Sequence, residues 1–154
     1  MLKNILKNLV KDFNEREAEI VAWAVASEGC ITLFNIQPYG KNKRTQIRPS
    51  VQISNTELIF LVKLRKMCGG SIYLHHRKFE GHKDVYQLVI TGKKSVLKFL
   101  EKIYPFLPIK RKQAKTVMAF CKSRLKRKKK VPYNKYEVSL AKKIRILNKR
   151  GTKK

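Results

Sequence analysis

The chain is poor in acidic residues and has no long apolar stretch. Only 10 Asp and Glu stand against 37 Lys and Arg among 154 residues, which gives a formal net charge of +27. The longest uninterrupted apolar run, Ile20 to Ala26, is far too short to span a bilayer. A chain with this charge repels itself unless a polyanion neutralises it. Nucleic acid is the expected partner, an acidic membrane surface is the alternative, and binding should weaken steeply with salt.

Cysteine and histidine are also scarce. The three cysteines, Cys30, Cys68 and Cys121, form no CxxC pair, which argues against a zinc site or a disulfide framework. We expect them to be small core residues in a reducing compartment. The three histidines match no metal-ligand spacing, so base contacts, phosphate contacts or a place in a turn are expected of them. With no secretory segment at the N-terminus, the expected location is inside the cell with the host DNA, in cytoplasm, nucleoid or organelle.

The apolar pattern predicts the order helix, hairpin, helix, hairpin, helices. The expected helices cover residues 15–27, 56–68, 96–103 and 109–125, and the expected strands cover 30–37, 45–54, 71–78 and 84–91. This order predicts an α+β fold with an αββαββα core, in which helices cover one face of a four-stranded antiparallel sheet. Pro49 needs an edge or a bulge in its strand, and Asn55 or Thr56 is the expected cap of the second helix.

Two further segments flank this core. Residues 1–14 form a basic amphipathic segment, expected to dock as a short helix, and residues 15–125 form the core domain. Residues 126–154 form a basic extension. Within it Tyr136, Leu140, Ile144 and Leu147 make a helical stripe that predicts a docked fifth helix. The basic run at 124–130 has three interpretations, which are a nuclear localisation signal, a solvated helix end and a segment that binds DNA phosphates. We favour the last.

Strand alternation separates the two faces of the predicted sheet. Ile47, Val51 and Ile53 point toward the helices, and the Gln, Arg and Ser residues between them point away. An outer face of Arg, Gln, Ser, Thr and His with almost no acid suits hydrogen bonds to base edges, although a solvated face is the alternative. The candidate DNA contacts are Thr32, Asn35, Gln37, Lys43, Arg44, Gln46, Arg48, Ser50, Gln52, Tyr73, His75, Arg77, Gln87, Lys112, Arg127 and Lys128.

One acid is placed unusually. Glu28 ends the most hydrophobic helix, where its charge adds to the partial negative charge of the helix C-terminus. The conflict is resolved if the carboxylate and the terminal carbonyls share a divalent cation such as Mg²⁺; an exposed Glu at a frayed helix end is the alternative. Because residues 20–26 are apolar on every side, a partner subunit is expected to cover one side of this helix.

Residues 21–29, VAWAVASEG, resemble the LAGLIDADG helix and are followed by the expected strand start at 30–33. VQISN at 51–55 and YPFLPIKRKQA at 104–114 resemble two further segments of the family in the right order. The resemblance covers about residues 15–125. It departs from the name motif in Trp23 for Gly, Ala26 for the first Asp, and Glu28 for the second Asp, which keeps the carboxylate.

The resemblance implies a homing endonuclease whose saddle-shaped sheet lies in the DNA major groove. Glu28 would take the family's metal-binding position together with the backbone carbonyl of Ser27, Asn55 would position water, and Lys110 would lie near the scissile phosphate. The implied cofactor is Mg²⁺, with Ca²⁺ or Mn²⁺ as substitutes, and no small-molecule cofactor or membrane is implied. The activity would be hydrolysis of both DNA strands at a specific site, by a protein encoded in an intron.

A single motif in the chain implies a homodimer in which two motif helices pack at the two-fold axis. The residues expected at this interface are Ala22, Trp23, Ala26 and Ser27. A symmetric dimer would bind a long, pseudo-palindromic site. Two alternatives remain open. One is a non-catalytic DNA- or RNA-binding protein of the same fold, such as a transcription regulator or intron maturase, and the other is a basic RNA-binding or ribosome-associated protein.

Overall fold

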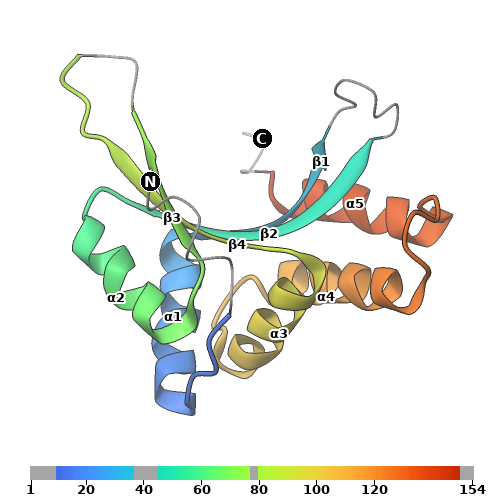
Figure 1. Ribbon diagram of the computed structural model, residues 1–154, viewed down its shortest axis with the longest axis horizontal. Coiled ribbons are helices and arrows are strands. Elements are labelled where there is room, and N and C mark those ends of the chain that lie inside the picture. Colours follow the sequence, from blue (N-terminus) through green and yellow to red (C-terminus); the bar gives the residue numbers. More distant parts are fainter. Residues whose placement is uncertain (1–9, 37–44, 77–79, 150–154) are drawn as a thin grey trace, which may run out of the picture.

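A computed structural model describes residues 10–36, 45–76 and 80–149 and shows an α+β fold (Figure 1). The elements are α1 (Glu15–Glu28), β1 (Gly29–Ile36), β2 (Gln46–Asn55), α2 (Leu58–Cys68), β3 (Ser71–His75), β4 (Val85–Thr91), α3 (Lys93–Ile103), the 3₁₀ turn η1 (Tyr104–Phe106), α4 (Arg111–Lys126) and α5 (Lys135–Leu147). The predicted αββαββα core is therefore confirmed. The two further helices that the sequence predicted after it are also present, as α4 and α5.

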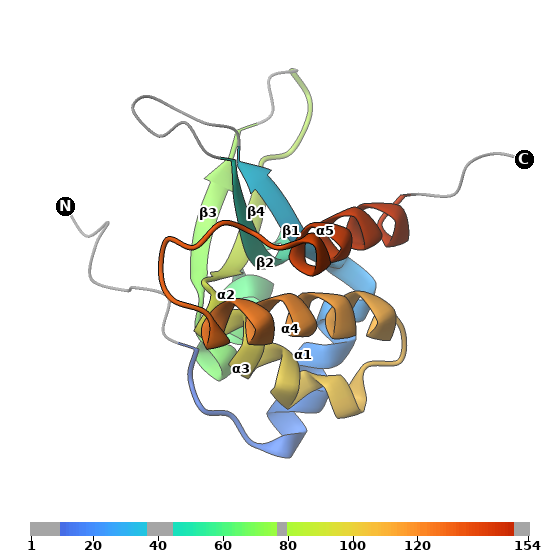
Figure 2. The same ribbon diagram turned by 90° about the vertical axis from the view of Figure 1, so that its right-hand side faces the viewer.

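The four strands form one antiparallel sheet in the order β1-β2-β4-β3. The sheet curves into a trough whose two hairpin ends rise on either side, while α1, α2, α3 and α4 lie beneath it (Figure 1). Figure 2 shows α5 lying against α4 near β1. The trough is the saddle shape that the resemblance implied, and its open side is the sheet face without a helical layer.

Pro49 lies where β2 has an uncovered edge. β4 pairs with β2 only from Ser50 to Asn55, so the first residues of β2 pair with β1 alone. The hydroxyl of Tyr133 fills part of this edge, since its oxygen accepts a hydrogen bond from the Ile47 N–H at 2.9 Å. Because proline has no N–H to satisfy, the position suits it, and the expected edge placement is confirmed.

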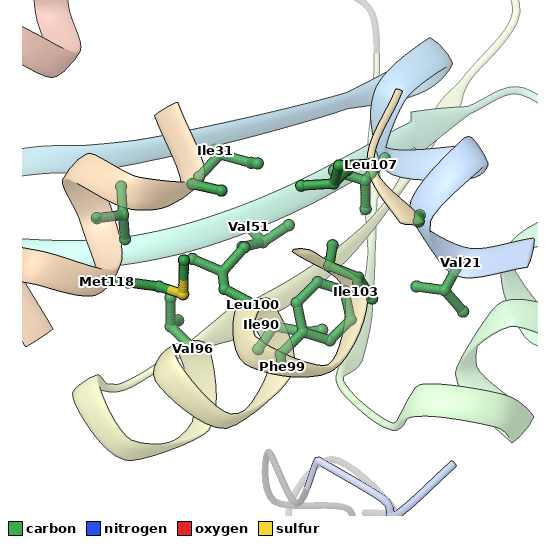
Figure 3. Close-up of a cluster of buried hydrophobic side chains, with 14 of the residues drawn as sticks. Val21, Ile31, Val51, Ile90, Val96, Phe99, Leu100, Ile103, Leu107 and Met118 are labelled. Carbon is green, nitrogen blue, oxygen red and sulfur yellow. The ribbon is translucent and has the colours of Figure 1, made fainter. Parts of the chain in front are cut away.

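The core lies between the trough and the helices beneath it. Figure 3 shows Val21 of α1, Ile31, Val51 and Ile90 of the sheet, and Phe99 of α3 converging there. Cys68 and Cys121 are buried as expected, and burial raises the pKa of each thiol to about 12. Cys30 is exposed, which corrects the expectation for that residue. None of the helices described is long and apolar enough to cross a membrane.

The orientation of α1 corrects part of the predicted dimer interface. Ala22 and Ala26 are 0% and 5% exposed and belong to the chain's own core. Ile20, Trp23 and Ser27 are exposed instead, and their spacing of three and four residues places them on one side of the helix. A run of seven apolar residues contains no polar position from which this orientation could be read.

The N-terminal segment docks as extended chain over the residues that the structure describes. Val10 forms a bridge with Gly69, the Lys11 N–H donates to the Cys68 carbonyl at 3.0 Å, and Phe13 is buried. Residues 10–14 are therefore not part of the expected docking helix, and residues 1–9 lie outside the described range.

A buried carboxylate attaches α5 to α4. Glu137 is fully buried and accepts hydrogen bonds from the Ser123 hydroxyl at 2.8 Å and from the guanidinium groups of Arg127 at 2.9 Å and Arg124 at 3.3 Å. Tyr136, which the helical stripe had placed inward, is exposed. Arg127 therefore has a structural role as an ion-pair partner of Glu137 that the sequence did not indicate, and its expected DNA contact stays a prediction.

The environment of Glu137 favours its charged form. Burial alone would raise the pKa of this carboxyl, but the hydrogen bonds from Ser123, Arg127 and the Asn134 backbone and the charge of Arg124 outweigh burial and lower it. A group whose pKa is lowered on folding contributes stability at pH values above its unfolded pKa, and that contribution is lost as the pH falls.

We predict that Glu137→Ala destabilises the protein by about 3–5 kcal/mol, because two arginines lose their buried counter-charge. Urea unfolding at neutral pH measures the change. The matched control is Glu101→Ala, which removes an exposed ion pair to Lys122 and should cost less than about 1 kcal/mol. The stabilising contribution of Glu137 should also shrink as the pH is lowered below about 4.5. Equal effects of the two substitutions would contradict the structural role of Glu137.

Candidate active site and nucleic-acid interface

The C-terminal end of α1 is closed by a lysine from a distant part of the chain. The Lys110 ammonium donates to the backbone carbonyls of Val25 at 3.1 Å and Gly29 at 2.6 Å. Lys110 immediately precedes α4 and has a left-handed backbone conformation, with φ 65°. Non-glycine residues seldom adopt this conformation, and those that do are concentrated at functional sites. The ammonium lies near enough to the Glu28 carboxylate for the two charges to interact, and its expected place near the scissile phosphate stays a prediction.

The position of Lys110 explains how an acid is accommodated at the negative end of a helix dipole. A cation bound to the terminal carbonyls offsets both the dipole and the Glu28 carboxylate. Partial burial lowers the pKa of Lys110, although the neighbouring Cys30 and Glu28 act in the opposite direction. Within one chain, Lys110 therefore supplies a positive charge at the end of α1, where the sequence alone predicted a divalent cation.

Glu28 is exposed at the end of α1. The described residues contain no group of three His, Cys, Asp or Glu side chains that could hold a metal ion. An oxygen-only donor such as Glu28 suits Mg²⁺, which commonly binds one or two carboxylates together with substrate phosphates. A single carboxylate at this helix end would need further oxygen donors, such as those of a phosphate, to hold Mg²⁺.

Asn55 lies at the end of β2 beside this site. The pairing of Gly29 with Ile53 brings the end of β2 next to the end of α1. The Asn55 side-chain oxygen accepts from the Glu57 N–H at 2.8 Å, which leaves its amide N–H groups as donors. Asn55 is not the cap of α2, because the N-cap residue is Glu57. Asn55 was a predicted N-cap because Asn is common at that position. In the structure it accepts a hydrogen bond from the N-cap residue, Glu57, instead.

The trough face of the sheet is mostly polar and carries no acid among its described residues, although Phe34, Ile36, Val85 and Val89 also lie on it. Gln46, Arg48, Gln52, Thr32, Tyr73, His75 and Gln87 lie on this face by strand alternation. Three of them are linked across strands. The Gln87 amide donates to the Gln52 oxygen at 3.0 Å and to the Ser54 hydroxyl at 3.2 Å, and its oxygen lies 3.1 Å from the His75 ring nitrogen. This chain of hydrogen bonds holds the side chains in fixed orientations.

Two candidate contacts are placed differently from the expectation. Ser50 lies on the trough face but is 1% exposed, and its hydroxyl has no partner among the described atoms. Asn35 shares the helix-side alternation of Ile31 and Leu33, opposite Ile47, although it is exposed near the strand end. Strand alternation gave the correct face for Ser50, but its burial depends on neighbouring side chains that the sequence does not reveal, and Asn35 was chosen by residue type, which does not fix the face of its strand.

The remaining candidates fall into two groups. Lys112 and Lys128 are exposed basic residues at the start and just beyond the end of α4. Gln37, Lys43, Arg44 and Arg77 lie outside the described residues, so their predicted contacts stay predictions. Cys30, which the sequence placed in the core, instead lies exposed beside Gln52 in the strand pairing, two residues after Glu28.

Solved structures share this architecture. The homing endonuclease I-CvuI, in complex with its target in the presence of calcium, matches with a TM-score of 0.68 and 23% identity over 91% of this chain and 87% of that one. The archaeal intron-encoded I-Vdi141I, complexed with DNA, matches with a TM-score of 0.66 and 14% identity over 91% and 89% of the two chains. The LAGLIDADG homing endonuclease I-LtrWI, bound to target DNA, gives 0.59 and 12% over 88% and 44%. The chain has the LAGLIDADG homing endonuclease fold.

This LAGLIDADG fold is reached at low sequence identity. No protein-family model and no curated protein sequence matches the chain. The chain spans most of I-CvuI and I-Vdi141I but about half of I-LtrWI. The resemblance recognised in residues 21–29, 51–55 and 104–114 is therefore confirmed at the level of the fold, and the residue roles that it implies stay predictions.

We predict that Lys110→Met lowers the free energy of unfolding by about 1.5–3 kcal/mol, because two carbonyls at the end of α1 lose a charged donor. Lys112→Met is the matched control, since Lys112 is exposed two residues further along and should change stability by less than about 0.5 kcal/mol. Thermal and urea unfolding measure both. An unchanged stability for Lys110→Met would show that the ammonium does not hold α1 in solution.

Proposed function

We propose that the chain is a site-specific endonuclease of double-stranded DNA that acts as a homodimer, uses a divalent cation, preferably Mg²⁺, and is encoded in an intron. The observation that carries the proposal is that Glu28 ends a helix whose exposed side is apolar and whose terminal carbonyls bind the Lys110 ammonium. The acid-free trough supports DNA as the substrate. The similar folds of I-CvuI and I-Vdi141I, both bound to DNA, support the same class of activity.

The exposed side of α1 supports a dimer. Trp23 and Ile20 are 58% and 44% exposed, which leaves a large apolar surface in water. The Ser27 hydroxyl donates back to the carbonyls of Trp23 at 2.9 Å and Ala24 at 3.3 Å, so this side presents no unsatisfied hydroxyl. A second copy packed here would bury the apolar side chains and bring two Glu28 carboxylates together. The match to about half of I-LtrWI fits a unit that occurs in pairs.

Each residue of the site has a chemical role in this proposal. Glu28 would hold the cation together with its copy from the second chain and with phosphate oxygens. When bound, the cation would polarise the phosphate and lower the pKa of coordinated water. The Lys110 ammonium has three N–H donors and uses two on the α1 carbonyls, which leaves one for a phosphate oxygen. The free amide N–H of Asn55 would orient a water molecule.

We predict that Glu28→Gln reduces cleavage by about a thousandfold or more, because a carboxylate ligand is lost and each tenfold corresponds to 1.36 kcal/mol of barrier. The assay uses a DNA site selected from a random duplex library by the wild-type protein, with and without Mg²⁺. Binding to the same duplex should change by only a few-fold. Full cleavage by the variant would refute the site. Binding without cleavage by the wild type would instead favour a regulator or maturase of the same fold.

We predict that Trp23→Glu converts the dimer to a monomer in sedimentation experiments, because two carboxylates would meet across the two-fold axis. The matched control is Ile146→Glu on α5, since Ile146 is also an exposed apolar residue, at 68%, and lies away from α1 in the fold. The control should leave the dimer intact. Identical sedimentation of the two variants would contradict an interface built on α1.

A further inference from the structure

A basic groove lies at the uncovered edge of β2. It has a volume of about 1220 Å³ and runs between the first residues of β2, the start of α3 and the connection from α4 to α5. Arg48, Lys93, Arg124 and Lys130 line it, together with neutral residues, and none of its lining residues is acidic. We call this feature the β2–α3 groove.

The wall formed by the α4–α5 connection is held firmly. The Arg124 guanidinium lies 4.6 Å from the Tyr133 ring centroid and donates to the Val131 carbonyl at 3.1 Å. The Tyr133 hydroxyl is bonded in turn to the backbone of Ile47. The charge of Arg124 is already matched by Glu137. Arg124 therefore has a structural role in the wall of the groove. The cations available to bind a ligand are Arg48, Lys93 and Lys130.

Three cations of the groove have no acidic counterpart in the described part of the chain. Arg48, Lys93 and Lys130 are exposed and occur in none of the ion pairs found there. Lys130 also has a left-handed backbone, with φ 68°. Three like charges converging on one groove repel one another, and an anion bound between them would remove that cost.

The start of α3 adds to the positive potential. Its N-cap is Gly92, which has no side chain to bond the first N–H groups, and its first turn carries no acid. The unpaired N–H groups and dipole of a helix N-terminus favour anions. The groove also contains Gln46 and Arg48, which belong to the trough face of β2, so it is continuous with the candidate DNA surface.

We propose that the β2–α3 groove binds backbone phosphates of the DNA that lies in the trough, at a place distinct from the site at Glu28. Arg48 would face the duplex from the sheet, and Lys93 and Lys130 would hold phosphate oxygens from the two walls. Such contacts set position and affinity rather than base preference. The inference rests on DNA being the ligand of the proposed function, but it requires neither cleavage nor a dimer.

The test is the salt dependence of binding to a fluorescent duplex of random sequence. Each phosphate contact contributes about 0.9 to the slope of log affinity against log salt. The triple variant Arg48→Gln, Lys93→Gln, Lys130→Gln should lower the slope by roughly two to three and weaken binding by roughly tenfold per contact at about 0.1 M salt. Circular dichroism checks that the variant is folded.

The control removes the same charge elsewhere. Lys63→Gln, Lys66→Gln and Lys98→Gln lie on exposed positions of α2 and α3 beneath the sheet. This control should leave the slope within about 0.5 of the wild type. Equal slope changes in the two triple variants would show a general charge effect and would overturn the proposal that the β2–α3 groove binds phosphates. An unchanged slope in the groove variant would overturn it as well. If the wild-type protein did not cleave DNA in Mg²⁺, but the groove variant still lowered the slope of log affinity against log salt as expected, only the proposed function would be refuted.

Discussion

The contact between the Lys110 ammonium and the end of α1 holds the candidate site together. It joins the C-terminus of the most hydrophobic helix to the start of α4, across 81 and 85 positions of sequence. Without it, the charge of Glu28 would add to the negative end of the helix dipole with no ammonium bound to the terminal carbonyls to offset it. With it, the ammonium lies at the carbonyls of Val25 and Gly29, near enough to the Glu28 carboxylate for the two charges to interact, next to the first residues of β1.

The same contact is complete within a single chain, whereas the proposed metal site needs two chains. A single chain satisfies the helix end by itself, so Glu28 is free to serve another purpose. The apolar side of α1, with Ile20 and Trp23 exposed, offers a surface for a second copy. In the proposed dimer, the helix that carries the acid also carries the interface, so assembly and completion of the site become one event.

Much of the fold could be predicted from the sequence because its signals are local. Alternating apolar residues in the strands, glycine at helix ends and the proline at position 49 are each read within a few residues, and the structure confirms the element order. The helical stripe of the extension gave α5 but misplaced Tyr136, since the buried group is Glu137. A carboxylate is identified as buried only when its partners are known, and Arg124 and Arg127 lie on or beside another helix.

The site was predictable in part for the same reason. Glu28 was identified from its position at a helix end, and Lys110 from a resemblance over residues 104–114. That Lys110 bonds the Val25 and Gly29 carbonyls could not be read from the chain, because it depends on how α4 packs against α1. The burial of Ser50 and of Ala22 likewise depends on neighbours from other elements, which residue type and spacing do not reveal.

The most direct measurement mixes wild-type chains with Glu28→Gln chains by co-expression and follows double-strand cleavage of a selected DNA site. If two Glu28 residues complete one site at a two-fold axis, activity should fall as the square of the wild-type fraction, to about a quarter in an equal mixture. A linear fall to about one half would mean that each chain cuts alone, and it would contradict the account.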